Sequence, residues 1–168
     1  MLLDSDAFIQ ILLTGSTGIL KKLKAEYSVQ SLVVEAVEAE VYRLASGRLS
    51  HIRPALDRTI NSGTVRVLTE NLLAHEKGTA IGTSLFNQAD QLGWRLHLSI
   101  DRGEAYSHGA AMTLGVPVVT HDREAVNRLG LDGVRFTEPV LRLYDLIGFG
   151  VQIGLLNHPD CDKGETLC

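Results

Sequence analysis

Short apolar runs alternate with longer stretches of helical pattern along almost the whole chain, and this alternation constrains the fold more than any other feature. The runs are rich in valine and leucine, and each is only three or four residues long. Strands that alternate with helices are typical of a mainly parallel sheet flanked by helices. The predicted strands are residues 1–3, 32–34, 65–68, 116–119 and 134–136. We therefore expect an α/β fold.

The stretches between these runs carry the spacing and the end signals of helices. Residues 7–24 are expected to hold one short helix, a turn near residues 14–18 and the start of a second helix. Pro139 suits the first turn of a helix, where a missing N–H costs nothing. The predicted helices after this region are residues 36–45, 54–62, 78–92, 103–114, 123–129 and 139–147.

Length and composition indicate one globular domain with an appended tail. The chain has 168 residues, 45% of them hydrophobic and 21% charged, which suits one domain with its own core. We place the domain at residues 1–148 and a polar C-terminal extension, loose or docked on a partner, at residues 149–168. The start of the chain has no basic, apolar leader, and no apolar run reaches the roughly 20 residues that span a bilayer. We expect a cytoplasmic protein with no membrane partner.

The tail and the net charge carry weaker signals. His158, Cys161 and Cys168 offer three zinc ligands without a fourth, which is a weak zinc pattern. The net charge of −4 argues mildly against a broad nucleic-acid surface. Carboxylates gathered around a metal ion would count as negative in the same sum, so the charge does not exclude a nucleic-acid substrate.

Four acidic residues, far apart in sequence, are predicted to reach the same rim of the sheet. Asp4 and Asp122 each follow a predicted strand, and Glu104 lies in the first turn of a predicted helix. Glu40 borders a buried helical stripe. Ligands of open parallel sheets bind at the carboxyl ends of the strands, so this rim is where chemistry is expected.

Each acid also has an ordinary explanation. Asp4 and Asp122 are suited to cap the helices that follow them, and Asp101 with Glu104 has the spacing of a capping box. Glu40 could pair with Arg43 on the same helix. The conjunction of the four is what favours a metal site, because oxygen-only ligands select Mg²⁺ or Mn²⁺ and an ion relieves the repulsion among gathered carboxylates.

The order and context of these acids resemble the PIN-domain nucleases. The segments that carry the resemblance are residues 2–9, 40–44, 103–111 and 118–122. The resemblance covers roughly residues 1–137. It implies a three-layer α/β/α sandwich of the Rossmann-like type and a metal-dependent endoribonuclease that uses one or two ions. It also implies RNA as substrate and, in many members, an antitoxin partner and a homodimer.

Carried over residue by residue, the resemblance assigns catalytic and metal-binding roles to the four acids. The first acid of the family corresponds to Asp4, the second to Glu40 with Glu38 as the alternative, the third to Glu104 and the fourth to Asp122. Asp101 and Asp6 are possible accessory ligands. The chain departs from the family pattern in its C-terminal segment, which is longer than in a minimal toxin, and in carrying glutamate at the third position where many members have aspartate.

The residues around the acids suggest supporting roles. Ser5 and Thr120 could hydrogen-bond a ligating carboxylate or a metal-bound water. His121 is expected to be a bystander, with contact to the substrate or leaving group as the alternative, and His108 is expected to be structural. The arginines near the acids either contact phosphate or pair with the acids, and these are Arg43, Arg102 and Arg123.

Two other functions stay open. A PIN-like scaffold could bind RNA or a protein without cleavage. Asp4 and Asp6 also have the Asp-x-Asp spacing of haloacid-dehalogenase-type phosphatases, although a second acidic pair of that family is missing.

Overall fold

Five parallel strands form a single sheet in the computed structural model, which describes residues 1–154. The strands are β1 (Leu2–Leu3), β2 (Ser31–Val34), β3 (Val65–Leu68), β4 (Val118–Thr120) and β5 (Val140–Arg142). Their order is β3-β2-β1-β4-β5. Leu2 of β1 lies opposite Leu32 of β2 on one side and Val118 of β4 on the other, which places β1 at the centre.

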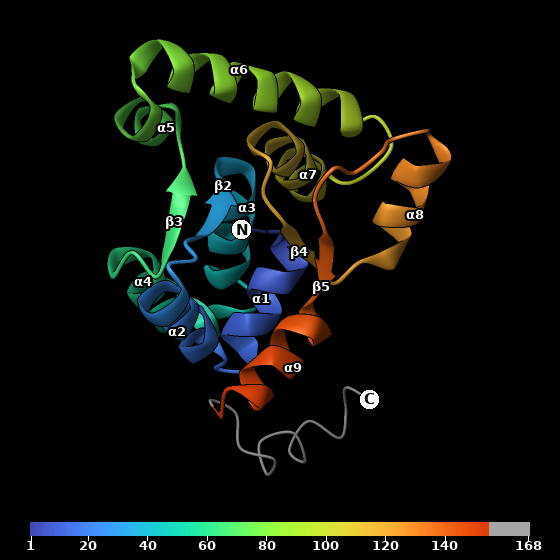
Figure 1. Cartoon of the computed structure of the whole chain (residues 1–168). Coiled ribbons are helices and arrows are strands. Elements are labelled where there is room, and N and C mark those ends of the chain that lie inside the picture. The colour runs from blue at the N-terminus through green and yellow to red at the C-terminus, as the bar shows by residue number, and fades with distance from the viewer. Residues whose placement is uncertain (155–168) are drawn as a thin grey trace.

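Helices cover both faces of this sheet, so the predicted α/β class and the three-layer, Rossmann-like arrangement are confirmed (Figure 1). In Figure 1, α5, α6 and α7 lie above the strands, whereas α2 and α9 lie below them. The helices are α1 (Ser5–Leu13), α2 (Thr17–Tyr27), α3 (Glu35–Ala45), α4 (Arg53–Asn61), α5 (Glu70–Lys77), α6 (Thr79–Leu96), α7 (Arg102–Leu114), α8 (Arg123–Leu131) and α9 (Leu143–Gln152), with a short 3-10 turn at Ser50–Ile52.

Most predicted helices are present with small shifts of their ends. The helix expected at residues 78–92 continues to Leu96 as α6. The two helices expected within residues 7–24 are α1 and α2. Helix α5 was not predicted. Its start is defined by Thr69, whose hydroxyl accepts a hydrogen bond from the Leu72 amide at 3.1 Å, which is the usual way a threonine caps a helix.

The C-terminal part of the sheet differs from the prediction. Residues 134–136 are not a strand, and the fifth strand is β5, within the segment expected to begin a helix at Pro139. Pro139 precedes the strand, and its carbonyl accepts a hydrogen bond from the Val118 amide at 3.3 Å. A proline at the start of an edge strand costs no ladder hydrogen bond, so the proline signal suited both structures. The helix follows as α9 from Leu143.

The start of the fourth strand and the end of the domain also differ from expectation. β4 begins at Val118 rather than at residue 116. The boundary expected between residues 148 and 149 falls inside α9, which continues to Gln152. Residues 155–168, with the zinc pattern of the tail, lie outside the described residues. Within the described part of the chain, none of the helices combines the length and the apolar character needed to cross a membrane.

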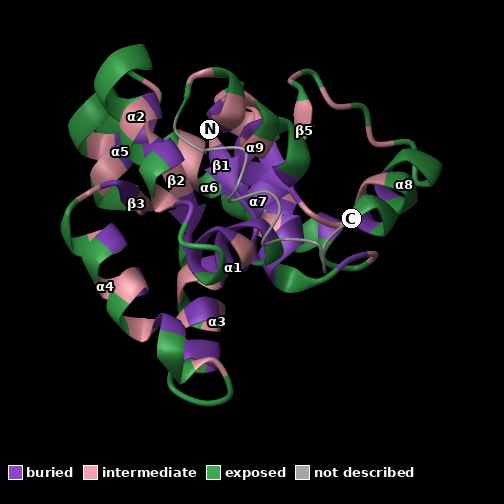
Figure 2. Cartoon of the chain, turned by 90° about the horizontal axis from the view of Figure 1, so that it is seen from below, coloured by how far each residue is buried: buried purple, intermediate pink, exposed green. Residues whose placement is uncertain are grey.

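The core lies between the sheet and its helices, and buried residues concentrate around β1, α1 and α7 (Figure 2). Helices α6 and α7 approach each other closely at two glycines. A β-carbon added to Gly109 would come within 2.5 Å of the backbone nitrogen of Gly93, so only glycine fits there. This contact, with the small residues expected on one face of residues 103–114, holds α7 firmly against α6 and thereby fixes the position of its first turn.

Candidate active site

The sheet order creates a crevice at the carboxyl ends of β1 and β4. The chain runs outward from β1 to β2 and β3 on one side, whereas β4 and β5 lie on the other side. The point where this order reverses is the position at which open α/β sheets bind ligands. Asp4 directly follows β1, and Asp122 follows β4 after one intervening residue, His121. The two strand-end acids predicted from the sequence therefore flank this crevice.

Asp4 is a buried carboxylate that is only partly satisfied. Its exposed fraction is 0%, and its Oδ1 accepts a hydrogen bond from the Ala7 amide at 2.7 Å, which caps α1. Its Oδ2 is buried without a hydrogen-bond partner. Burial raises the pKa of Asp4 to about 6, and the charge of Asp6 adds to the rise, while hydrogen-bonding interactions with the Thr120 hydroxyl, the Ala7 amide and the His121 backbone oppose it. A buried, unpartnered carboxylate oxygen is costly and is a suitable place for a cation.

Glu104 lies in the first turn of α7 and is 8% exposed. Burial and then the charges of Asp122, Asp4 and Asp101 raise the pKa of Glu104 to about 8. The capping-box explanation for Asp101 and Glu104 is wrong, because the Asp101 side chain makes no capping hydrogen bond to α7. Glu104 therefore lies near three other acids, and a capping box with Asp101 does not account for its position.

Asp122 is the open counterpart of Asp4. It is half-buried, and its Oδ1 accepts a hydrogen bond from the Glu124 amide at 2.6 Å, which caps α8. The backbone N–H of Asp122 donates to the Thr120 hydroxyl at 3.0 Å. Asp122, Glu104 and Asp101 line the same cleft, with a volume of about 430 Å³. Three of the acids assigned to the metal site therefore share one water-accessible space.

Glu40 reaches the site through Ser5. The Ser5 hydroxyl donates a hydrogen bond to Oε2 of Glu40 at 2.6 Å, so the expected contact of Ser5 with a candidate carboxylate is present. Gly103 closes over this pair, since a β-carbon there would collide with Ser5 Oγ and lie 2.9 Å from Oε2 of Glu40. The alternative partner Arg43 is exposed and forms no ion pair with Glu40.

Glu38 does not share this environment. Burial and the charge of Glu35 raise the pKa of Glu38, whereas Glu40 is among the charges that raise the pKa of Asp6. Asp6 lies in the first turn of α1. Its pKa is raised first by partial burial of the carboxyl group, and the charges of Asp122 and Asp101 add to the rise. Asp6 and Asp101 are thus electrostatic neighbours of the cluster on its open side, and their role as accessory ligands stays a prediction.

Basic residues border the acids without pairing to them. None of the ion pairs of the described residues joins an arginine to one of the site acids, although the Arg128–Glu124 pair lines the same cleft. The suggestion that Arg43, Arg102 or Arg123 neutralises a site acid is therefore wrong for this structure. Arg123 and Arg142 line a second hollow with His121, next to Asp122, on the β4–β5 side. Arg142 was not found from the sequence, because it ends a strand that had been read as a helix.

The two histidines differ in their surroundings. The His121 ring lies 5.8 Å from the Tyr144 ring, at the border of the acidic cluster. His108 on α7 is buried, and its ring centre lies 5.2 Å from that of Phe136. Neither ring nitrogen of His108 has a hydrogen-bond partner in the described residues. His108 is enclosed by the core, which agrees with the structural role expected for it.

The donor set fits a hard divalent cation in kind but is not assembled around one. All candidate ligands are carboxylates, which Mg²⁺ and Mn²⁺ prefer, and Asp4 offers an unpartnered buried oxygen. Among residues 1–154, no group of three or more His, Cys, Asp or Glu side chains has the arrangement of a metal site. The site is therefore one of close, mutually repelling carboxyl groups.

The sequence was compared with protein-family models and with curated proteins, and neither comparison found a match.

Proposed function

We propose that the protein is a metal-dependent endoribonuclease of the PIN-like type. The observation that carries the proposal is the unpartnered, fully buried Oδ2 of Asp4 beside Glu104, whose pKa is raised to about 8. Both groups lie at the crevice between β1 and β4. A protein gains no stability from such a pair, and perturbed carboxyl groups in a cleft are typical of functional sites.

Asp4, Glu104, Asp122 and Glu40 would hold one or two Mg²⁺ or Mn²⁺ ions, with Asp101 at the open side. When bound, such an ion supplies positive charge that makes water a better nucleophile and offsets the charge that develops on a phosphodiester. Burial and then the neighbouring acids raise the pKa of Glu104, and binding would oppose both causes, because a nearby cation favours the ionised carboxyl.

The residues around the acids would orient the RNA. Ser5 fixes the carboxylate of Glu40 through its 2.6 Å hydrogen bond. Arg123 and Arg142 border the cleft on the β4–β5 side, where guanidinium groups can bind phosphate oxygens. The substrate phosphate would therefore lie between this arginine pair and the acids.

The burial of Asp4 weighs against the phosphatase alternative. A phosphatase of the Asp-x-Asp type attacks phosphorus with the first aspartate, whereas the Asp4 carboxyl group has an exposed fraction of 0% and is used to cap α1. A toxin role with an antitoxin partner, and a homodimer, remain extensions of the proposal that depend on partners.

The test is cleavage of a mixed RNA pool with Mg²⁺, with Mn²⁺ and with chelator. We expect cleavage with either ion, none with chelator, and none by Asp4→Asn, while Asp132→Asn is fully active because Asp132 is exposed on the far end of α8. Calorimetric titration with Mn²⁺ separates the scaffold alternative. A wild-type protein that neither binds Mn²⁺ at millimolar concentration nor cleaves RNA is a scaffold, and the proposal is then wrong.

A further inference from the structure

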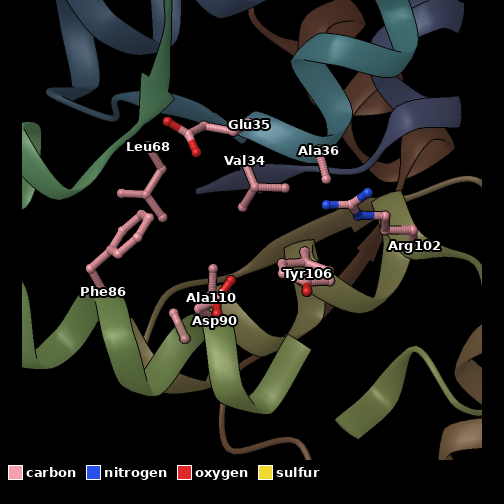
Figure 3. Close-up of a pocket in the computed structure, with 10 residues that line it drawn as sticks. Val34, Glu35, Ala36, Leu68, Phe86, Asp90, Arg102, Tyr106 and Ala110 are labelled. Atoms are coloured by element: carbon pink, nitrogen blue, oxygen red, sulfur yellow. The ribbon is translucent and has the colours of Figure 1, made fainter. Parts of the chain in front are cut away.

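A small hollow lies on the β2–β3 side of the sheet rim, across the first turn of α7 from the acidic cleft (Figure 3). Its volume is about 90 Å³. The floor consists of buried apolar residues that end the strands or face inward from the helices, and these are Val34, Leu68, Ala89 and Ala110. The strands are parallel, so the hollow opens at the same rim as the proposed active site.

The walls combine aromatic rings with carboxylates. Phe86 of α6 lies on one side and Tyr106 of α7 on the other, and both are half-buried. Glu35, at the start of α3, and Asp90 of α6 are exposed and face the hollow from opposite sides (Figure 3). The guanidinium carbon of Arg102 lies 5.6 Å from the centre of the Tyr106 ring, which places a positive charge at the border with the acidic cleft.

We propose that this hollow is a nucleobase subsite that selects an amino-bearing, single-ring base, cytosine, in the RNA strand. The inference rests on the proposed function and specifies its substrate. Aromatic walls suit a flat ring, and side-chain carboxylates accept hydrogen bonds from the exocyclic amino group of cytosine. A hollow of about 90 Å³ favours one ring over a fused pair. Uracil presents a carbonyl at the position of that amino group and meets a carboxylate unfavourably.

The placement beside the acids supports a base rather than a protein side chain. Arg102, Tyr106 and Ala110 recur every four residues along α7 and form one stripe that lines the hollow, while Glu104 lines the acidic cleft. An α-helix is about 10 Å across with its side chains. An RNA strand that crosses the first turn of α7 can therefore place its phosphate at the acids and a neighbouring base in the hollow. Arg102 would meet the backbone between them.

The test is binding of fluorescent oligocytidine and oligouridine to the full-length protein in chelator, so that neither oligomer is cleaved. We expect the wild type to bind oligocytidine about tenfold more tightly, a ratio within the range of one good base contact. The double variant Glu35→Gln, Asp90→Asn should lose this preference and keep its affinity for oligouridine. Asp132→Asn removes one charge far from the hollow and should keep the preference.

Equal affinities for the two oligomers in the wild type would overturn the subsite, and so would a cytidine preference that survives in the double variant. A protein partner docked in the hollow in place of RNA corresponds to the first of these results. Because binding is measured without divalent ions, the outcome is independent of whether the protein cleaves RNA with Mg²⁺ or Mn²⁺. Failure of the subsite and failure of the proposed nuclease activity are therefore distinguishable.

Discussion

The turn from β1 to α1 and the turn from β4 to α8 are built alike and yet differ in electrostatic state. In each, an aspartate at the end of a central strand caps the next helix through its Oδ1, with Asp4 bound to the Ala7 amide and Asp122 to the Glu124 amide. Asp4 is buried with an unpartnered Oδ2, whereas Asp122 is half-buried and faces the cleft. The same capping interaction is therefore combined with the cost of a buried charge only at Asp4, on the β1 side of the crevice.

This difference indicates how the site is divided. On the β1 side, Asp4 is fully buried and its pKa is raised to about 6. Glu104, whose pKa is raised to about 8, lines the cleft between the two sides together with Asp122. The β4 side is open and is bordered by arginines. A cation would gain most from the β1 side, and a phosphate would approach from the β4 side. Substitutions that remove the charge of a carboxyl group but keep its shape, made on each side in turn, test this division.

The largest expected effect is on catalytic activity, and we expect it for substitutions on both the β1 side and the β4 side. Asp4→Asn and Asp122→Asn are each expected to lower metal-dependent RNA cleavage by about a thousandfold, which corresponds to about 4 kcal/mol of transition-state stabilisation. Calorimetry should show the larger loss of Mn²⁺ affinity for Asp4→Asn, because Oδ2 of the buried carboxylate has no hydrogen-bond partner among the described residues. Equal loss of affinity in the two variants would contradict the division into a metal side and a phosphate side.

His108 isolates the effect of burial from that of neighbouring charge. Burial alone lowers the pKa of His108 to about 4, from 6.5. The unfolded chain therefore takes up a proton near pH 6.5 and the folded protein does so only near pH 4, so that His108 lowers stability as the pH falls through this window. We expect a cost of about 3 kcal/mol between pH 7 and pH 4.

The measurement is the free energy of unfolding of wild type and His108→Leu across this pH range. Leucine removes the ionisable group and the two unpartnered nitrogens, so the variant should gain stability relative to the wild type as the pH falls. His97→Leu serves as a control, because His97 is exposed at the end of α6. A difference between His108→Leu and wild type that does not grow toward low pH would contradict the burial of an uncharged ring.

Glu104 changes stability with pH in the opposite direction to His108. Its effect is smaller, because water enters the cleft that Glu104 lines. Its pKa is raised from 4.5 to about 8, so the folded protein holds a proton that the unfolded chain has lost. Stability without metal therefore declines as the pH rises from about 4.5 through about 8. Glu104→Gln should remove this decline and raise the free energy of unfolding at pH 8.5 by about 2 kcal/mol. This is less than the full shift implies, because water in the cleft solvates and screens the charge.

Thermal unfolding in chelator and in Mn²⁺ is the measurement for this variant. The advantage of Glu104→Gln should disappear in Mn²⁺, because the ion stabilises only the wild-type carboxylate. Glu124→Gln, in the first turn of α8, breaks an exposed ion pair with Arg128 and should change stability by no more than about 0.5 kcal/mol. If the two glutamine variants behaved alike, the electrostatic contrast between the two sides would be lost.

The sequence was sufficient for the alternation of strands and helices and for the four acids, because both depend on local patterns. It failed at β5, where Pro139 satisfies the rules for a helix start and for an edge strand equally well, and where only pairing with Val118 decides between them. Arg142 was missed for the same reason. Once β5 is recognised, Arg142 is a strand-end residue in the same position as the acids at the ends of β1 and β4.

The state of each acid was beyond the sequence. Asp4 and Asp122 have the same neighbours in the chain, a strand before and a helix after, and their burial depends on what packs across them. Helix α7 lies against β1, β2 and β4, with the Ser107 hydroxyl 3.4 Å from the carbonyl of Leu3, the residue before Asp4, and Gly93 and Gly109 let α6 pack closely on its other side. No local pattern encodes such a long-range contact.

The smallest expected effect is also the most direct test of the comparison between the two turns. Asparagine caps a helix about as well as aspartate, so Asp→Asn removes charge while the hydrogen bond to the helix remains. Asp4→Asn should raise the free energy of unfolding in chelator at pH 7.5 by about 1 kcal/mol. The pKa of about 6 reflects the cost of a buried charge, which asparagine does not carry. The gain is limited because the asparagine amide is itself a buried polar group without a partner. Asp122→Asn should leave it unchanged within about 0.5 kcal/mol, as is usual for a residue that still meets water. Denaturant titration of the two variants beside the wild type decides the matter. A loss of stability in Asp4→Asn would show that the buried carboxylate contributes to the fold, and it would remove the reason for expecting a cation there.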